Sequence, residues 1–122
     1  MRSENSLCVL VVEDESLLRM DTVYFLEEEG FKVLEANNAD AAILILEKHK
    51  EIRLIFTDIH MPGSMDGLKL AHYVRRRWPP VKIILTSGKR DLVDEEMPVD
   101  SFFMTKPYGH SALKQKICEM VA

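Results

Sequence analysis

Short apolar runs alternate with helical patterns along the whole of this 122-residue chain. The five runs that we expect to form strands span 7–12, 31–36, 53–58, 81–87 and 101–106. Strands that are separated by helices pair in parallel, and right-handed crossovers lay the helices on both faces of the sheet. The pattern therefore predicts an α/β protein, a flavodoxin-like doubly wound (βα)5 fold whose central parallel five-stranded sheet has the order 2-1-3-4-5.

Capping and breaking residues indicate where the helices begin and end. Asn38 and Asp66 are placed to cap two helices, because short polar side chains accept hydrogen bonds from free backbone N–H groups. Gly30 suits the end of the first helix, and the prolines at 79–80 end the third. The stretch 89–97 is polar with few apolar residues, so we expect the fourth helix to be short or irregular.

Apolar residues at helical spacing predict the first and last helices. In the segment 15–29 these residues are Leu17, Met20, Val23 and Tyr24. Near the C-terminus they are Leu113, Ile117 and Met120. A stripe of this kind is typical of a helix that packs one face on a sheet.

Composition and charge limit the function classes. A net charge of −4 argues against a nucleic-acid-binding surface. No apolar run reaches the ~18 residues of a membrane span, and the run near the N-terminus is too short for a signal peptide. Cys8 and Cys118 lie far apart in apolar patterns, so we expect reduced residues in or near the core of a cytoplasmic protein.

Polar side chains collect where the predicted strands end. In chain order these are Glu13 and Asp14, Asp58, Thr86 and Ser87, and Lys106. Ligands of open α/β sheets bind outside the carboxyl ends of the strands. In the order 2-1-3-4-5 the first and third strands are neighbours, so we expect three carboxylates to meet at one edge, flanked by a hydroxyl and an amine.

Three carboxylates at one edge predict a cation, because their mutual repulsion would otherwise raise their pKa values. Hard oxygen ligands in a small open site suit Mg²⁺, and a cation with an amine and a hydroxyl suits a phosphoryl group. Asp58 is then a candidate nucleophile that forms an aspartyl-phosphate. Taken singly, Asp58 is more often a cap or turn residue and Lys106 a solvated charge; their convergence on one edge favours the chemical interpretation.

Four motifs resemble those of response-regulator receiver domains, the phosphoacceptors of two-component signalling. They are "VLVVEDE", "IFTDIHMPGSMDG", "IILTSG" and "FFMTKPY". The resemblance implies that Asp58 is phosphorylated, that Asp14 binds Mg²⁺ directly and that Glu13 reaches the metal through water. It also implies that the backbone carbonyl of His60 is a metal ligand and that Lys106 contacts the phosphoryl group.

The resemblance further implies a switch pair. Its hydroxyl is Ser87, which is followed by the small Gly88, with Thr86 as the alternative. Its aromatic residue is Phe103, three residues before the lysine, which turns inward on activation; the ordinary alternative is a ring that stays in the core. Phe102 should face the opposite side of the strand.

The resemblance covers residues 1–122 as one receiver domain, of the short single-domain kind found in alphaproteobacteria. It implies a histidine kinase or histidine phosphotransfer protein as donor, and no enzymatic activity beyond assisting its own phosphorylation and dephosphorylation. We expect no attached output domain, so the signal would pass to a downstream protein through the surface of 89–97, 101–106 and the last helix. The resemblance leaves open whether the chain forms a homodimer.

Two other functions fit the sequence less well. A Mg²⁺-dependent aspartyl-phosphate phosphohydrolase would need a second acid where His60 stands, together with a cap domain for which the chain has no room. A flavodoxin-like cofactor binder would need a glycine- and hydroxyl-rich loop where this chain has "EDES", whose charge opposes a phosphate.

Overall fold

The computed structural model describes residues 7–88 and 97–122 and has the alternating architecture expected from the sequence. Its strands are β1 (Cys8–Val12), β2 (Lys32–Ala36), β3 (Ile52–Asp58), β4 (Lys82–Ser87) and β5 (Ser101–Thr105). Its helices are α1 (Ser16–Glu28), α2 (Ala39–Lys48), α3 (Gly67–Arg77) and α4 (His110–Val121). The short or irregular helix expected at 89–97 falls on residues 89–96, outside the described residues, so α4 is the last helix predicted from the sequence.

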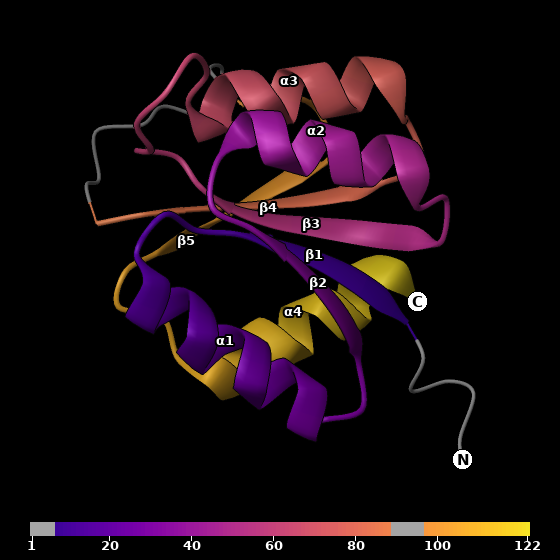
Figure 1. Cartoon of the computed structure of the whole chain (residues 1–122). Helices are drawn as coiled ribbons and strands as arrows, with labels where there is room; N and C mark the ends of the chain where they lie inside the picture. Colours follow the sequence, from indigo (N-terminus) through magenta and orange to yellow (C-terminus); the bar gives the residue numbers. More distant parts are fainter. Residues whose placement is uncertain (1–6, 89–96) are drawn as a thin grey trace.

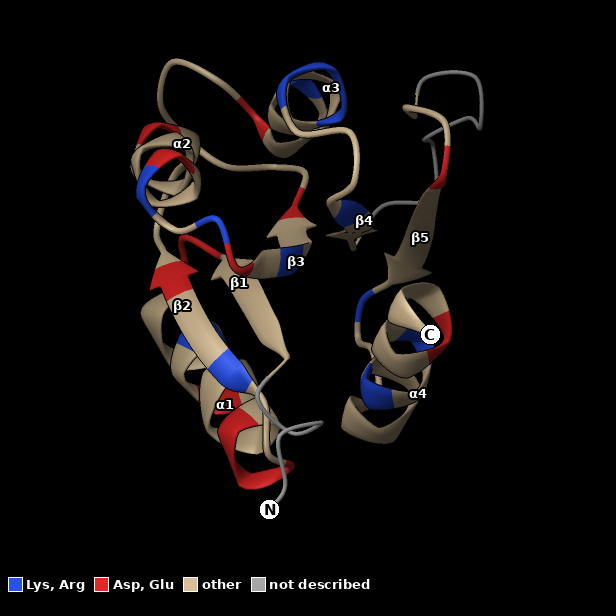
Figure 2. Cartoon of the chain, turned by 90° about the vertical axis from the view of Figure 1, so that its right-hand side faces the viewer, with Lys and Arg blue, Asp and Glu red and all other residues tan. Residues whose placement is uncertain are grey.

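The strands form one parallel sheet in the order β2-β1-β3-β4-β5, which confirms the predicted topology. Helices α2 and α3 cover one face, and α1 and α4 cover the other (Figures 1 and 2). Side chains alternate along each strand between two apolar clusters. In β4, for example, Ile83 and Leu85 pack beneath α2 and α3, whereas Ile84 packs against the cluster of α1 and α4. Both faces of the sheet are thus buried, which explains the nearly continuous apolar strands.

The predicted caps are confirmed. The side chain of Asn38 accepts a hydrogen bond from the Ala41 N–H at 2.8 Å, and that of Asp66 accepts one from the Lys69 N–H at 2.9 Å. Gly30 follows α1 with a φ of 99°, a conformation that glycine adopts without steric cost. The two caps lie in loops that border the carboxyl edge of the sheet, whereas Gly30 lies at the opposite edge, where β2 begins.

Helix α1 packs on the sheet through a different stripe from the one its sequence pattern predicts, so the expected packing of Leu17, Met20 and Tyr24 is wrong. Thr22, Val23 and Leu26 are buried, but Leu17, Met20 and Tyr24 are 80%, 60% and 65% exposed. Helix α4 shares this face of the sheet, so α1 contributes only one side to the core (Figure 1). The other side of α1 is open to solvent and carries these three apolar residues beside acids such as Asp21.

The expectation of a core or near-core Cys118 is wrong. Cys8 is buried in β1, but Cys118 is exposed on α4, and both are free thiols. Helix α4 buries Leu113 and Ile117, which are four residues apart. The next position lies ~100° further round the helix and turns away from the sheet.

None of the helices that the structure describes is long and apolar enough to cross a membrane.

Candidate functional site

Three acids meet at the carboxyl edge of the sheet. Asp58 ends β3, and Glu13 and Asp14 follow β1, the strand beside it. One carboxylate oxygen from each lies within 4.8 Å of the others. Glu13 and Asp58 are only 4% and 6% exposed, whereas Asp14 is open to solvent. The convergence of these side chains is therefore as the sequence predicted.

Lys106 connects this cluster to β5, an edge strand of the sheet. Its backbone N–H donates to the Ser87 carbonyl at 2.9 Å, which continues the β4–β5 ladder beyond β5. Its Nζ donates to Asp58 Oδ2 at 3.1 Å and to Glu13 Oε1 at 3.3 Å. Burial alone would lower the pKa of Lys106, but the hydrogen bond and charge of Asp58, with a further contribution from Glu13, raise it. The amine is therefore a cation at neutral pH.

Glu13 is the least exposed of the three acids. Burial raises the pKa of its carboxyl group, and the neighbouring Asp58 charge adds to the rise. The Glu15 N–H, which donates to Oε2 at 3.1 Å, and Lys106 act in the opposite direction. Among the described residues, three acids face one ammonium group, so the cluster favours a further cation. Its donors are all hard oxygens, and one is exposed, as a hydrated Mg²⁺ requires.

The turn after Asp58 brings the start of α3 against the end of β3. Gly63 has a φ of 111°, so the turn uses a glycine where other residues would be strained. A Cβ on Gly67 would lie 1.8 Å from the Asp58 carbonyl oxygen, so no side chain fits there. The Gly67 N–H donates to the Ile59 carbonyl at 2.8 Å. This requirement at Gly67 was not predicted, although a glycine directly after the cap Asp66 was visible in the sequence.

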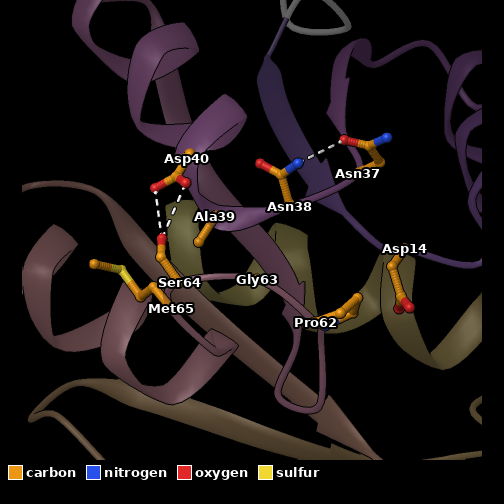
Figure 3. Close-up of a pocket in the computed structure, with 9 residues that line it drawn as sticks. All are labelled: Asp14, Asn37, Asn38, Ala39, Asp40, Pro62, Gly63, Ser64 and Met65. Atoms are coloured by element: carbon orange, nitrogen blue, oxygen red, sulfur yellow. Dashed lines mark hydrogen bonds between the residues drawn. The ribbon is translucent and has the colours of Figure 1, made fainter.

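A pocket of about 380 Å³ opens beside Asp14, between the loops 37–40 and 62–65 (Figure 3). Ser64 donates to both oxygens of Asp40, at 3.0 and 3.2 Å, and so joins the turn after β3 to the first turn of α2. The pocket leaves Asp14 accessible to a small hydrated ion. His60, from the turn after β3, is exposed.

The two hydroxyls at the end of β4 are both 1% exposed but have different surroundings. Thr86 pairs in register with Asp58, and its Oγ1 has no hydrogen-bond partner among the described residues. Leu85 and Phe103 pair in register and pack in the same apolar cluster. By alternation, Ser87 lies on that same face of the sheet, as Phe103 does.

The ring of Phe103 is partly buried against the cluster under α2 and α3, whereas Phe102 packs in the cluster of α1 and α4. The prediction that the two rings face opposite sides is confirmed.

The segment after Lys106 is attached to α1. The Tyr108 hydroxyl lies 2.8 Å from Thr22 Oγ1, and burial raises the pKa of Tyr108. His110 stacks on Phe25 with ring centroids 4.6 Å apart. These contacts hold the loop that carries Lys106 against the helix that follows the acidic turn.

The chain matches the model of the response regulator receiver domain family over residues 9–118 and belongs to that family. It is 34% identical over 120 residues to the sensor kinase CckA of Brucella abortus, and 33% identical over 108 residues to the transcriptional regulatory protein PdtaR of Mycobacterium tuberculosis. These alignments take 95% and 86% of this chain but only 13% and 52% of those proteins.

Solved structures show the same fold. The chain superposes on a response regulator receiver protein from Sinorhizobium medicae with a TM-score of 0.88 and 26% identity, covering 98% of this chain and 97% of that one. For the receiver domain of the hybrid histidine kinase CckA, the TM-score is 0.81 at 27% identity, with 94% and 99% covered.

Receiver domains are regulatory switches of two-component systems that depend on phosphorylation. They bind Mg²⁺ at an acidic pocket and interact with histidine kinases or phosphotransfer proteins and with downstream partners. The cluster of Glu13, Asp14 and Asp58 is an acidic site of the kind that could hold a metal ion.

Proposed function

We propose that this chain is a signalling switch whose Asp58 accepts a phosphoryl group in the presence of Mg²⁺. The observation that supports it most is the contact of Lys106 with Asp58, at 3.1 Å, within a cluster of three acids. A nearly buried carboxylate beside one cation and an open acidic rim is arranged to receive an anion with several oxygens.

The reaction places a new bond on Asp58. One of its carboxylate oxygens attacks phosphorus, the bond from phosphorus to the imidazole nitrogen of a donor histidine breaks, and the imidazole keeps the electron pair. Lys106 balances the charge of the phosphoryl oxygens. A bound Mg²⁺ supplies the remaining charge compensation; Asp14, Asp58 and the His60 carbonyl would hold it directly, and Glu13 through water.

Acetyl phosphate with MgCl₂ tests the acceptor directly. The intact mass of the chain should rise by one phosphoryl group, and the Asp58→Asn variant should show no rise. The matched control is Asp66→Asn, which keeps a side chain that can cap α3 and should be labelled like the parent chain. A mass gain in Asp58→Asn equal to that of the parent would refute the assignment.

The output of the switch is a change in protein binding. In our proposal Ser87 donates a hydrogen bond to the phosphoryl group and draws the end of β4 toward Asp58, and Phe103 turns inward on the same face of the sheet. The surface formed by β5 and α4 then changes its affinity for a partner, because a bound group can only select between conformations. A structure with beryllofluoride on Asp58 tests this: an unchanged Phe103 rotamer would contradict the switch role.

The exposed side of α1 is where we propose that the protein donor docks. Leu17, Met20 and Tyr24 are exposed there, and a pocket of about 410 Å³ between α1 and the 106–110 loop connects this side to Lys106. With a histidine kinase that labels the chain, Leu17→Ser should slow transfer while labelling by acetyl phosphate stays unchanged. Leu44→Ser is the control, since Leu44 is 59% exposed on α2, across the sheet. Equal slowing in both variants would refute the docking surface.

Two kinds of message are compatible with this chemistry: a diffusible regulator, or a shuttle that passes phosphate to a second histidine. The likeness to the receiver domain of a hybrid histidine kinase supports the second, and the likeness to a response regulator receiver protein supports the first. A phosphorylated sample mixed with a histidine phosphotransfer protein separates them, because only a shuttle loses its phosphate to that protein.

A further inference from the structure

Arg19 of α1 makes hydrogen bonds to the turn after β1, which carries Glu13, and to β2. Its Nη1 donates to the backbone carbonyl of Glu13 at 2.8 Å, and its Nε donates to Glu35 Oε1 on β2 at 3.0 Å. The arginine side chain is 18% exposed, against 49% for Glu35. One guanidinium group therefore joins α1, the end of β1 and the edge strand β2.

With the bond from Arg19, every polar group of Glu13 has a hydrogen-bond partner. The Glu13 N–H donates to the Ala36 carbonyl at 3.0 Å, and its carboxylate is held by Glu15 and Lys106. Arg19 secures the last polar group, the carbonyl. Each backbone and side-chain group of Glu13 thus has a partner.

This carbonyl belongs to the peptide plane from which Asp14 begins, because the peptide bond is planar and moves as one unit. Within the described part of the chain, no hydrogen bond or ion pair holds the Asp14 carboxylate. The backbone therefore sets the point from which the Asp14 side chain extends, and Arg19 holds the carbonyl of that peptide.

We infer that Arg19 is a positioning residue for the cation site, and that it aims Asp14 by holding the Glu13–Asp14 peptide. The inference rests on the proposed Mg²⁺ function of the acids. The affinity for Mg²⁺ then depends on the position of α1, although Arg19 itself is a cation and would not contact the metal.

Charge and geometry predict opposite results for the loss of Arg19. If the arginine acted only through its charge, its removal would strengthen Mg²⁺ binding, because like charges repel. If it positions Asp14, its removal weakens binding, as the loss of outer-shell partners does by about 10-fold in other metal sites. The direction of the change therefore decides between the two.

Isothermal titration with MgCl₂ tests the inference on the full chain. Trp78 is not a suitable reporter, because it lines a pocket with Ile52 at the opposite end of β3 from Asp58. Arg19→Gln should bind Mg²⁺ about 10-fold more weakly than the parent chain. Glu35→Gln, which removes the ion pair but keeps the bond to the Glu13 carbonyl, should bind like the parent. Circular dichroism in urea reports separately on folding.

A second variant covers the case that Arg19→Gln does not fold. Arg19→Met keeps the length and apolar packing of the side chain but donates no hydrogen bond to the Glu13 carbonyl, so it should also bind Mg²⁺ more weakly than the parent. If the parent binds Mg²⁺ and the folded variants bind it equally or more tightly, the inference is overturned and the proposed function stands. If the parent chain itself binds no Mg²⁺, both are overturned.

Discussion

Replacing Thr86 by valine should stabilise the protein. Thr86 is 1% exposed, and its hydroxyl has no hydrogen-bond partner among the described residues. A buried hydroxyl without a partner costs about 1–3 kcal/mol of desolvation, and valine has nearly the same shape. We therefore expect Thr86→Val to raise the free energy of unfolding by about 1 kcal/mol. For a domain of this size, that gain raises Tm by about 4 °C.

Thr57→Val is the matched control. Thr57 is also fully buried, on the neighbouring strand, but its hydroxyl donates to the Asp58 carbonyl at 3.0 Å. The same substitution should therefore cost about 1 kcal/mol there. Urea denaturation without Mg²⁺ measures both variants against the parent chain. A loss of stability in Thr86→Val as large as that in Thr57→Val would refute the reasoning, because it would show that the Thr86 hydroxyl is satisfied.

Three other variants address the site and its borders. Ser87→Ala should remove most of the conformational response to beryllofluoride, measured by amide chemical shifts, whereas Thr86→Val keeps it; the reverse pattern would make Thr86 the switch hydroxyl. Asp14→Asn should weaken Mg²⁺ binding in calorimetry more than Glu13→Gln does, because only Asp14 is proposed to bind the metal directly; equal losses would refute that ordering. Asp66→Ala should lower the free energy of unfolding by about 1 kcal/mol through loss of the α3 cap, and an unchanged urea midpoint would contradict it.

The fold was predictable because its signals are local or follow from topology. Apolar runs, the caps at Asn38 and Asp66 and the glycine at position 30 act within a few residues, and the structure confirms them. The side of α1 that faces the core was not predictable in this way. It depends on where α4 packs, so Leu17 fits a helical stripe and is nevertheless 80% exposed. For the same reason, the sequence pattern did not show that Cys118 of α4 is exposed.

The meeting of Glu13, Asp14 and Asp58 was predictable because neighbouring strand ends share an edge. The contacts that hold this edge in place were not predictable. Arg19 reaches the Glu13 carbonyl through a side-chain contact that no sequence period records. The need for glycine at position 67 comes likewise from the approach of α3 to the Asp58 carbonyl. Long-range contacts of this kind exist only once the helices are docked.

The most direct test of the account locates the phosphoryl group itself. The chain is labelled with acetyl phosphate and MgCl₂, the acyl phosphate is reduced with borodeuteride to deuterated homoserine, and the position is read by peptide mass spectrometry. The account predicts deuterated homoserine at position 58 and its absence when MgCl₂ is replaced by EDTA. Deuterated homoserine at position 14, deuterated 2-amino-5-hydroxypentanoic acid from Glu13, or no label at any position in a fully folded sample would contradict it.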